Sequence, residues 1–329
     1  TTFNDITIDD AIVLTNCIVI TSTTGSVFFN STVDSEATEL NTLAVSAPGQ
    51  VLFADDIGLV MDGELGSLTI DDSTDVDLAG NVELNGNFDI DTGAAGTVNI
   101  DGVVTTTNSG EVIITNDGVL TLADAASFNL DGAFTQDGSG NVTTGADITT
   151  TGDHVSFAEE VTLTENVAID TGAGIIGDIT FTKDVSGAAA LLLTAGIGSI
   201  AFSTIGSVTA VTGLTIQSAK DVTLNGNVNT AENGNIAITH SGLLSIDNGA
   251  TLTLGGTFVE DGTGTVETGA DISTTADNVT FNSAVTLTDG ISINSTGGNI
   301  SFASTLDGTS DLIESLTLNA DSGNIEFAN

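Results

Sequence analysis

The chain has 329 residues, 40% of them hydrophobic, with 45 acidic residues against two lysines and a formal net charge of −43. Such a surface cannot neutralise phosphates and repels anionic lipid, which argues against nucleic-acid binding and membrane insertion. There is no Trp or Tyr, and the single cysteine rules out an internal disulfide framework.

In chain order, the predicted strands are short and begin at once, with Phe3, Ile6 and Ile8. A recurring segment then reads Gly-x-apolar-x-apolar and often ends in Phe. Its copies are 25–29, 49–53, 177–181, 198–202, 298–302 and 323–327. Neighbouring copies are spaced by 24, 21 and 25 residues (51 − 27, 200 − 179, 325 − 300). Between them lie further alternating segments of about 3–5 residues, each with two apolar positions on one face.

One unit of about 21 residues therefore holds three short strands and three turns rich in Gly, Asn and Asp. This pattern predicts an all-β chain folded as a right-handed parallel β-helix (a β-solenoid) of about 15 coils. At roughly 4.8 Å per coil the rod would be about 70–75 Å long. The left-handed hexapeptide form requires a strict six-residue period, which the chain lacks. A string of β-sandwich domains is the competing fold, but its strands are longer and its core usually contains Trp or Tyr.

A longer repeat is laid over the short one. Residues 118–170 align without a gap on 242–294, so that Phe134 matches Phe258 (258 − 134 = 124). Internal repetition of this kind is typical of solenoids. We therefore expect one continuous solenoid over 1–329, with super-repeats at 98–221 and 222–329 of about six coils each.

The repeat phrasing, as in VTFNSAVTLTDGISINSTGGNISF (279–302), resembles the β-strand-repeat regions of large bacterial surface proteins, the filamentous-haemagglutinin-like and autotransporter-like adhesins. The resemblance covers nearly the whole chain from about Val13 onward. It implies a secreted location, at the cell surface or in the extracellular matrix.

The sequence contains no recognisable set of catalytic residues. The two histidines, His154 and His240, align with Asn278 and Asn116 in the other copy of the long repeat. Exchange with a turn-forming Asn predicts that both are exposed turn residues. Cys17 is expected to be a small buried hydrophobe. One Cys and two distant His do not make a zinc site, and no nucleophile–His–acid set can be assembled.

The acidic residues need an explanation, because like charges stacked every ~4.8 Å repel by about 1 kcal/mol per pair in water. The densest run contains Asp71, Asp72, Asp75 and Asp77. A solvated acidic face is the simplest interpretation; calcium bound by these four carboxylates is the alternative. No other cofactor is expected.

A solenoid without polar caps exposes unpaired strand edges. Apolar positions run close to both ends of the sequence, and we expect an interface there formed by Phe3, Ile6, Ile8, Leu316, Leu318, Ile325 and Phe327. The partners would be other copies of the chain, stacked head to tail, or flanking repeats of a longer chain.

Three functions follow as hypotheses. The first is a non-enzymatic extracellular structural protein, a fibre subunit assembled by end-to-end stacking. The second is the rod-like stalk or adhesive region of a large bacterial adhesin. The third is a polysaccharide-active β-helix enzyme. It is disfavoured because sugar sites usually offer a Trp or Tyr platform, and this chain has neither. Glycoside hydrolases also need a carboxylate pair at a defined separation, and among so many acidic residues no pair stands out.

Overall fold

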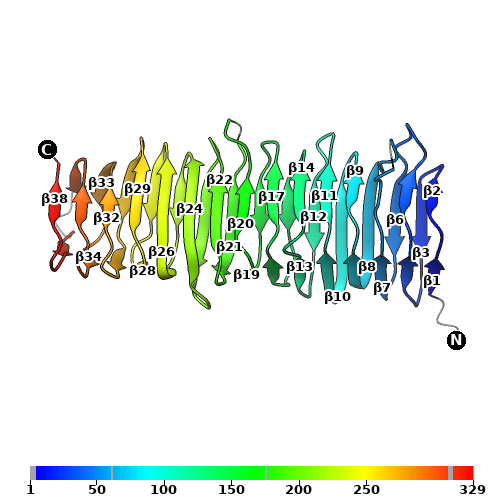
Figure 1. The fold of residues 1–329 in the computed structure, drawn as a ribbon, viewed down its shortest axis with the longest axis horizontal. Helices are drawn as coiled ribbons and strands as arrows, with labels where there is room; N and C mark the ends of the chain where they lie inside the picture. Colours follow the sequence, from blue (N-terminus) through cyan, green and yellow to red (C-terminus); the bar gives the residue numbers. More distant parts are fainter. Residues whose placement is uncertain (1–4, 61, 175, 310–313, 329) are drawn as a thin grey trace. The chain divides into compact units, whose positions relative to one another are not determined.

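A computed structural model describes residues 5–60, 62–174, 176–309 and 314–328. The chain divides into two compact units, Thr1–Val161 and Thr162–Asn329, called here the N-terminal and C-terminal units. In each unit, parallel strands stack coil upon coil into a β-solenoid (Figure 1), and the described residues make about 14 coils in all. The predicted fold class is confirmed.

The N-terminal unit contains β1 (Ile6–Ile8), β2 (Ile12–Leu14), β3 (Ile18–Thr21), β4 (Val27–Phe29), β5 (Val33–Ser35), β6 (Thr42–Ser46), β7 (Gln50–Phe53), β8 (Ser67–Leu78), β9 (Val82–Leu84), β10 (Phe88–Ile100), β11 (Val103–Thr106), β12 (Val112–Thr115), β13 (Leu120–Leu122), β14 (Ser127–Leu130), β15 (Phe134–Gln136), β16 (Val142–Thr144), β17 (Asp147–Thr150) and β18 (Val155–Phe157). The division between the units falls within β19 (Val161–Leu163).

The C-terminal unit contains β20 (Val167–Asp170), β21 (Ile179–Ser186), β22 (Ala190–Thr194), β23 (Ile200–Ile205), β24 (Val211–Ala219), β25 (Val222–Leu224), β26 (Val228–His240), β27 (Leu243–Ile246), β28 (Thr251–Leu254), β29 (Phe258–Gly262), β30 (Thr265–Thr268), β31 (Asp271–Thr274), β32 (Val279–Phe281), β33 (Ala284–Leu287), β34 (Ile291–Ser295), β35 (Ile300–Phe302), β36 (Leu306–Gly308), β37 (Leu316–Asn319) and β38 (Ile325–Phe327). The described residues contain no helix long and apolar enough to cross a membrane.

Three short strands per coil occur in the most regular part of each unit. In the N-terminal unit β11 pairs with β14, β12 with β15 and β13 with β16. In the C-terminal unit β29 pairs with β32, β30 with β33 and β31 with β34. Val112 lies opposite Phe134, 22 residues later, and Val279 lies opposite Ile300, 21 residues later. The period read from the sequence is therefore the length of one coil.

Some coils depart from three short strands. β8, β10 and β26 are 12 or 13 residues long, and each bends around a corner of the solenoid instead of stopping there. The bends use left-handed backbone at Asp72, Ala95 and Asn233, with φ of 60°, 65° and 63°. Asp and Asn tolerate this conformation better than other residues with a Cβ.

The interior is filled by side chains that repeat from coil to coil. Phe29 and Phe53 stack with ring centroids 4.4 Å apart, and Phe181 and Phe202 stack at 5.0 Å. Stacking of like side chains follows from the parallel register, which places each inward residue above its counterpart one coil away. Fully buried Val, Ile, Leu and Phe make this core, which is the dominant source of stability.

The turns explain much of the Asp and Asn content. A turn side chain accepts a hydrogen bond from the main-chain N–H one coil further along the chain. Asn278 Oδ1 accepts from the N–H of Asn299 at 2.8 Å, and Asn299 Oδ1 accepts from the N–H of Asn324 at 2.9 Å. Asp221 Oδ1 accepts from the N–H of Leu243 in the same way. These bonds satisfy backbone donors that the strands leave unpaired at the corners.

Candidate functional site

The last coil of the C-terminal unit exposes side chains that are buried in the preceding coil. Ile325 and Phe327 of β38 pair with Ile300 and Phe302 of β35. Ile325 is 43% exposed and Phe327 is 54% exposed, whereas Ile300 and Phe302 are at most 1% exposed. In the neighbouring column, Leu316 and Leu318 of β37 are half-buried. Within the described residues, no further strand covers this edge of β38 or β37.

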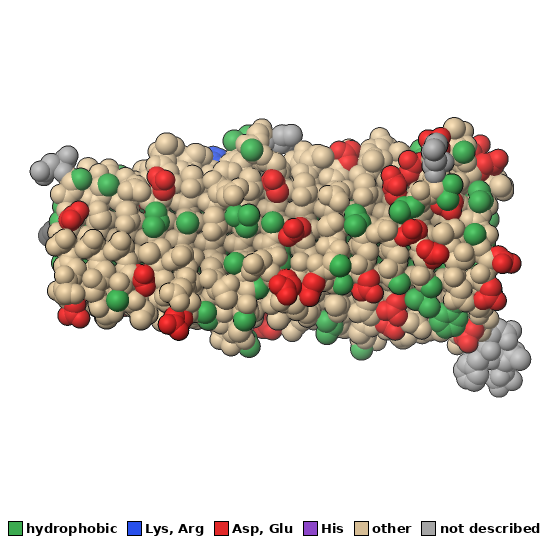
Figure 2. All heavy atoms as spheres, viewed as in Figure 1, with side chains coloured by type: hydrophobic (Ala, Val, Ile, Leu, Met, Phe, Trp, Pro, Cys, Tyr) green, Lys and Arg blue, Asp and Glu red, His purple; other side chains and the backbone are tan. Residues whose placement is uncertain are grey.

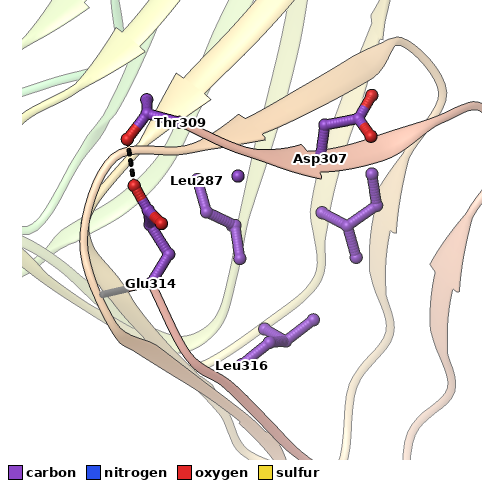
Figure 3. A pocket seen from close by; sticks show the side chains of 7 residues that line it. Leu287, Asp307, Thr309, Glu314 and Leu316 are labelled. Atoms are coloured by element: carbon purple, nitrogen blue, oxygen red, sulfur yellow. Dashed lines mark hydrogen bonds between the residues drawn. The ribbon is translucent and has the colours of Figure 1, made fainter. Parts of the chain in front are cut away.

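A hollow of about 410 Å³ opens beside this coil, between β33, β36 and β37. Leu287, Leu306 and Leu316 form its apolar floor, and Figure 3 shows Leu287 and Leu316 directed into the same space. Asp307 and Glu314 lie at its rim, where the Thr309 hydroxyl donates a hydrogen bond to the Glu314 carboxylate. Among the described residues, the lining of the hollow thus combines three leucines with two acidic side chains.

The first described coil of the N-terminal unit has the same character. Ile6 and Ile8 of β1 pair with Val27 and Phe29 of β4, which are fully buried, while the two isoleucines are half-buried. In the next column Ile18 of β3 is 37% exposed. The predicted interface residues that the structure describes therefore lie at partly exposed strand edges. Phe3, the remaining one, lies outside the described residues.

The four aspartates predicted to bind calcium are spread along bent strand β8. Asp71 and Asp72 are exposed at the bend. Ser73, which follows them and precedes Asp75 and Asp77, is fully buried. Asp75 accepts a hydrogen bond from the Thr97 hydroxyl at 2.6 Å, and Asp77 accepts one from the Asn99 amide at 2.7 Å. No group of three His, Cys, Asp or Glu side chains suited to one metal ion occurs in the described part of the chain. Calcium at these residues stays a prediction.

Charge repulsion is present along the acidic columns of the N-terminal unit. Asp71 lies opposite Asp91 in the next coil. Partial burial, and then the charges of Asp91 and Asp72, raise the pKa of Asp71 above its ordinary value. On the face drawn in Figure 2, Asp and Glu side chains are scattered instead of gathered at one place. This arrangement fits a solvated acidic surface.

The two histidines differ in the structure. His154 is exposed, as predicted. His240 is 2% exposed, so the prediction that it is an exposed turn residue is wrong. Its side chain points inward from the end of β26, because the alternation of that strand continues to its last residue.

The buried His240 belongs to a network that spans three successive coils of the C-terminal unit. Its Nε2 lies 3.0 Å from Glu260 Oε1, and both side chains are completely buried. Its Nδ1 lies 3.1 Å from the carbonyl oxygen of Gly242. Glu260 also accepts hydrogen bonds from the Ser283 hydroxyl at 2.7 Å and from the N–H groups of Asn282 and Ser283 at 3.0 and 2.9 Å.

The electrostatics of Glu260 favour the carboxylate. Burial raises the pKa of Glu260, but hydrogen bonds from His240 and from the N–H and hydroxyl of Ser283 outweigh it, so that the net pKa lies below the ordinary value. The glutamate lies between the histidine and the serine hydroxyl, unlike the order in which a histidine activates a serine nucleophile. The arrangement binds coils to one another through side chains that are all buried.

The lone cysteine departs from its predicted environment. Cys17 is exposed, so the prediction of a buried cysteine is wrong; it lies in the turn before β3, outside the inward alternation. Hydrogen bonds from Thr42 lower the pKa of its thiol. Elsewhere on the surface, Lys220 forms a salt bridge of 3.2 Å with Asp221.

Sequence reasoning missed Glu260, although a signal was present. Glu260 aligns with Gln136 in the long repeat (260 − 136 = 124), just as His240 aligns with Asn116. Two amides in one copy thus become two ionisable groups in the other. Comparison of the chain with protein-family models, curated proteins and solved structures gave no match.

Proposed function

We propose that this chain is a non-enzymatic structural protein, a subunit of an extracellular surface or matrix fibre assembled by end-to-end stacking of β-solenoids. The observation that carries the proposal is the contrast between buried and exposed copies of the same stacking position. Phe302 is 1% exposed and Phe327 is 54% exposed. A strand added beyond β38 would give Phe327 the environment that Phe302 has.

The main chain supports the same contact. An unpaired strand edge is a template for a further strand, and strand addition supplies regular main-chain hydrogen bonds. Completing the burial of half-exposed Ile and Phe side chains would contribute on the order of 1 kcal/mol each. The two surfaces differ, so the contact is heterologous and produces an open filament unless it closes into a ring.

The acidic composition fits this role. Charge repulsion between the sides of rods opposes lateral association, while the apolar positions at β1, β36, β37 and β38 remain available for growth along the axis. A secreted location, at the cell surface or in a matrix, is part of the proposal. A single continuous solenoid over 1–329, with super-repeats at 98–221 and 222–329, is likewise proposed.

The stalk of a large adhesin is the second candidate function. The same exposed edges accept flanking repeats of a longer chain equally well, because solenoid coils stack in the same way whether the next coil is covalently attached or not. In that case isolated copies of the chain would have little tendency to polymerise.

Negative-stain microscopy and sedimentation velocity over a range of protein concentrations separate the two. The fibre proposal expects long uniform fibres and a sedimentation coefficient that rises with concentration. The double variant Ile325→Asp/Phe327→Asp should remain monomeric, and Val208→Asp, which changes a residue 77% exposed outside β38, should assemble normally. Short isolated particles of the unmodified chain at every concentration would contradict the fibre and favour the stalk.

A further inference from the structure

The network around His240 has a neutral counterpart in the N-terminal unit. There Gln136 Nε2 donates a hydrogen bond of 2.9 Å to Asn116 Oδ1, and both residues are at most 1% exposed. Asn116 Nδ2 donates to the carbonyl oxygens of Gly118 and Gly140 at 2.7 and 3.1 Å. Gln136 Oε1 accepts from the N–H groups of Ala158 and Glu159, at 3.0 and 3.3 Å.

The two networks are built alike, position for position. Asn116 and His240 both contact a carbonyl oxygen two residues on, at Gly118 and Gly242. Gln136 and Glu260 both accept two successive N–H groups from the following coil. In both, a glycine closes tightly over the site: a Cβ at Gly264 would lie 2.8 Å from His240 Nδ1, and one at Gly140 would lie 2.6 Å from Asn116 Nδ2.

The two networks differ in whether their side chains can gain or lose a proton. Both ring nitrogens of His240 face oxygen acceptors, the Glu260 carboxylate and the Gly242 carbonyl. A doubly protonated ring donates to both acceptors, whereas a neutral ring turns one lone pair toward an oxygen. An amide pair presents the same donors and acceptors at every ordinary pH, while a histidine changes charge near neutral pH.

We propose that His240 and Glu260 form a pH-sensitive latch between three successive coils of the C-terminal unit. The latch is closed when the ring carries two protons and Glu260 is ionised. Loss of one ring proton at alkaline pH leaves a buried acceptor facing another acceptor, and the coils separate more easily at that corner.

Among the residues that the structure describes, few other charged side chains lie near the ring of His240. Ala219 of β24 lies opposite His240, and Lys220 and Asp221 follow it as an exposed ion pair. A hydrogen bond from Leu243, and more weakly the positive charges of Lys220 and His240, lower the pKa of Asp221. Glu260 and the exposed Asp261 lie on β29, and Asn282 and Ser283 beyond β32 are uncharged. The Glu260 carboxylate is the acidic group in direct contact with the ring.

Opening of the latch would change the shape of a nearby surface hollow. A surface hollow of about 190 Å³ lies beside His240, lined by Gly196, Ser218, Ala219, Thr239, Ser241, Gly262 and Thr263. Its residues come from successive coils, and weaker pairing at His240 would widen it.

The test uses the chain's own neutral pair as the control. The variant His240→Asn/Glu260→Gln installs in the C-terminal unit the pair already present in the N-terminal unit. Thermal unfolding of the purified chain is followed from pH 5 to pH 9, and the difference in melting temperature between wild type and variant is plotted against pH. We expect the wild type to lose roughly 3–10 °C relative to the variant toward alkaline pH, as for one unsatisfied buried group.

The reciprocal variant Asn116→His/Gln136→Glu should give the N-terminal unit the same alkaline sensitivity. His154→Asn, at the exposed histidine, should leave the pH dependence unchanged. Nitrogen chemical shifts of the ring give an independent measurement, and at pH 6 both nitrogens of His240 should be protonated. Parallel pH profiles for wild type and His240→Asn/Glu260→Gln, or a ring with one bare nitrogen at pH 6, would overturn the latch.

Discussion

The rings of Phe302 and Phe327 stack with centroids 5.4 Å apart and an interplanar angle of 7°, yet one ring is buried and the other is 54% exposed. The same side chain at equivalent positions of two paired strands thus differs in whether a further strand covers it. The exposed member belongs to the surface proposed for assembly.

Truncating the two rings should separate stability from assembly. Phe302→Ala should destabilise the C-terminal unit by about 3–5 kcal/mol, because it leaves a cavity in the core. Phe327→Ala should cost about 1 kcal/mol or less but should raise the concentration needed for fibre growth. Denaturant unfolding measures the first effect, and sedimentation the second. Equal losses of stability for both variants would refute the distinction.

Acid should weaken the network around Glu260. Its pKa is lower in the folded state than its ordinary value of 4.5, so its contribution to stability is fully present above the unfolded pKa and is lost as pH falls through the folded one. The free energy of unfolding of the wild type should therefore fall more steeply between pH 5 and pH 3 than that of Glu260→Gln.

The exposed Glu267 on β30 provides the matched control for this acid effect. Glu267→Gln should follow the wild-type curve across the same pH range, measured by urea unfolding at each pH. A Glu260→Gln curve as steep as that of the wild type would show that this carboxylate contributes nothing specific.

Neutralising Asp71 should stabilise the N-terminal unit at neutral pH. Partial burial and the charges of Asp91 and Asp72 raise the pKa of Asp71 in the folded protein. The ionised carboxylate of Asp71 therefore destabilises the folded state at neutral pH. Asp71→Asn should raise the melting temperature slightly at pH 7, with a gain below about 1 kcal/mol because solvent screens the charges. The gain should shrink in high salt and below pH 3.8, where Asp71 is no longer charged. A melting temperature lowered by Asp71→Asn would indicate a bound cation instead.

Calcium at Asp71, Asp72, Asp75 and Asp77 has its own test. A ligand bound only by the folded state raises the melting temperature according to its concentration and affinity. If calcium binds there, a chelator should lower the melting temperature clearly, and Asp75→Asn/Asp77→Asn should reduce that response. An unchanged melting temperature on chelation would reject this site.

The coil length and the strand positions could be predicted from the sequence because each inward apolar residue recurs at a fixed spacing. Val279, Val285 and Ile291 each begin an alternating segment, and in the structure each begins or lies in a separate strand of one coil. The long strands β8, β10 and β26 could not be predicted, since Asp72, Ala95 and Asn233, the residues in left-handed backbone, look the same in a sequence whether the strand ends or bends there.

The buried pair of His240 and Glu260 could not be predicted from the local sequence pattern. The long repeat aligns His240 with Asn116, and this exchange with a turn-forming Asn predicts an exposed histidine. In the structure both are buried, with Gln136 or Glu260 as partner one coil away. The partner lies 20 residues distant in sequence, and only the stacking of coils brings the two together.

By itself, the sequence determined that this protein is a stack of short parallel strands, because the alternation and spacing of apolar residues leave few other ways to bury them. Only the tertiary structure decided which polar residues lie inside and which apolar ones remain outside. His240 is buried although the sequence predicts an exposed turn residue, because burial depends on whether a neighbouring coil covers the position, and that neighbour is remote in sequence.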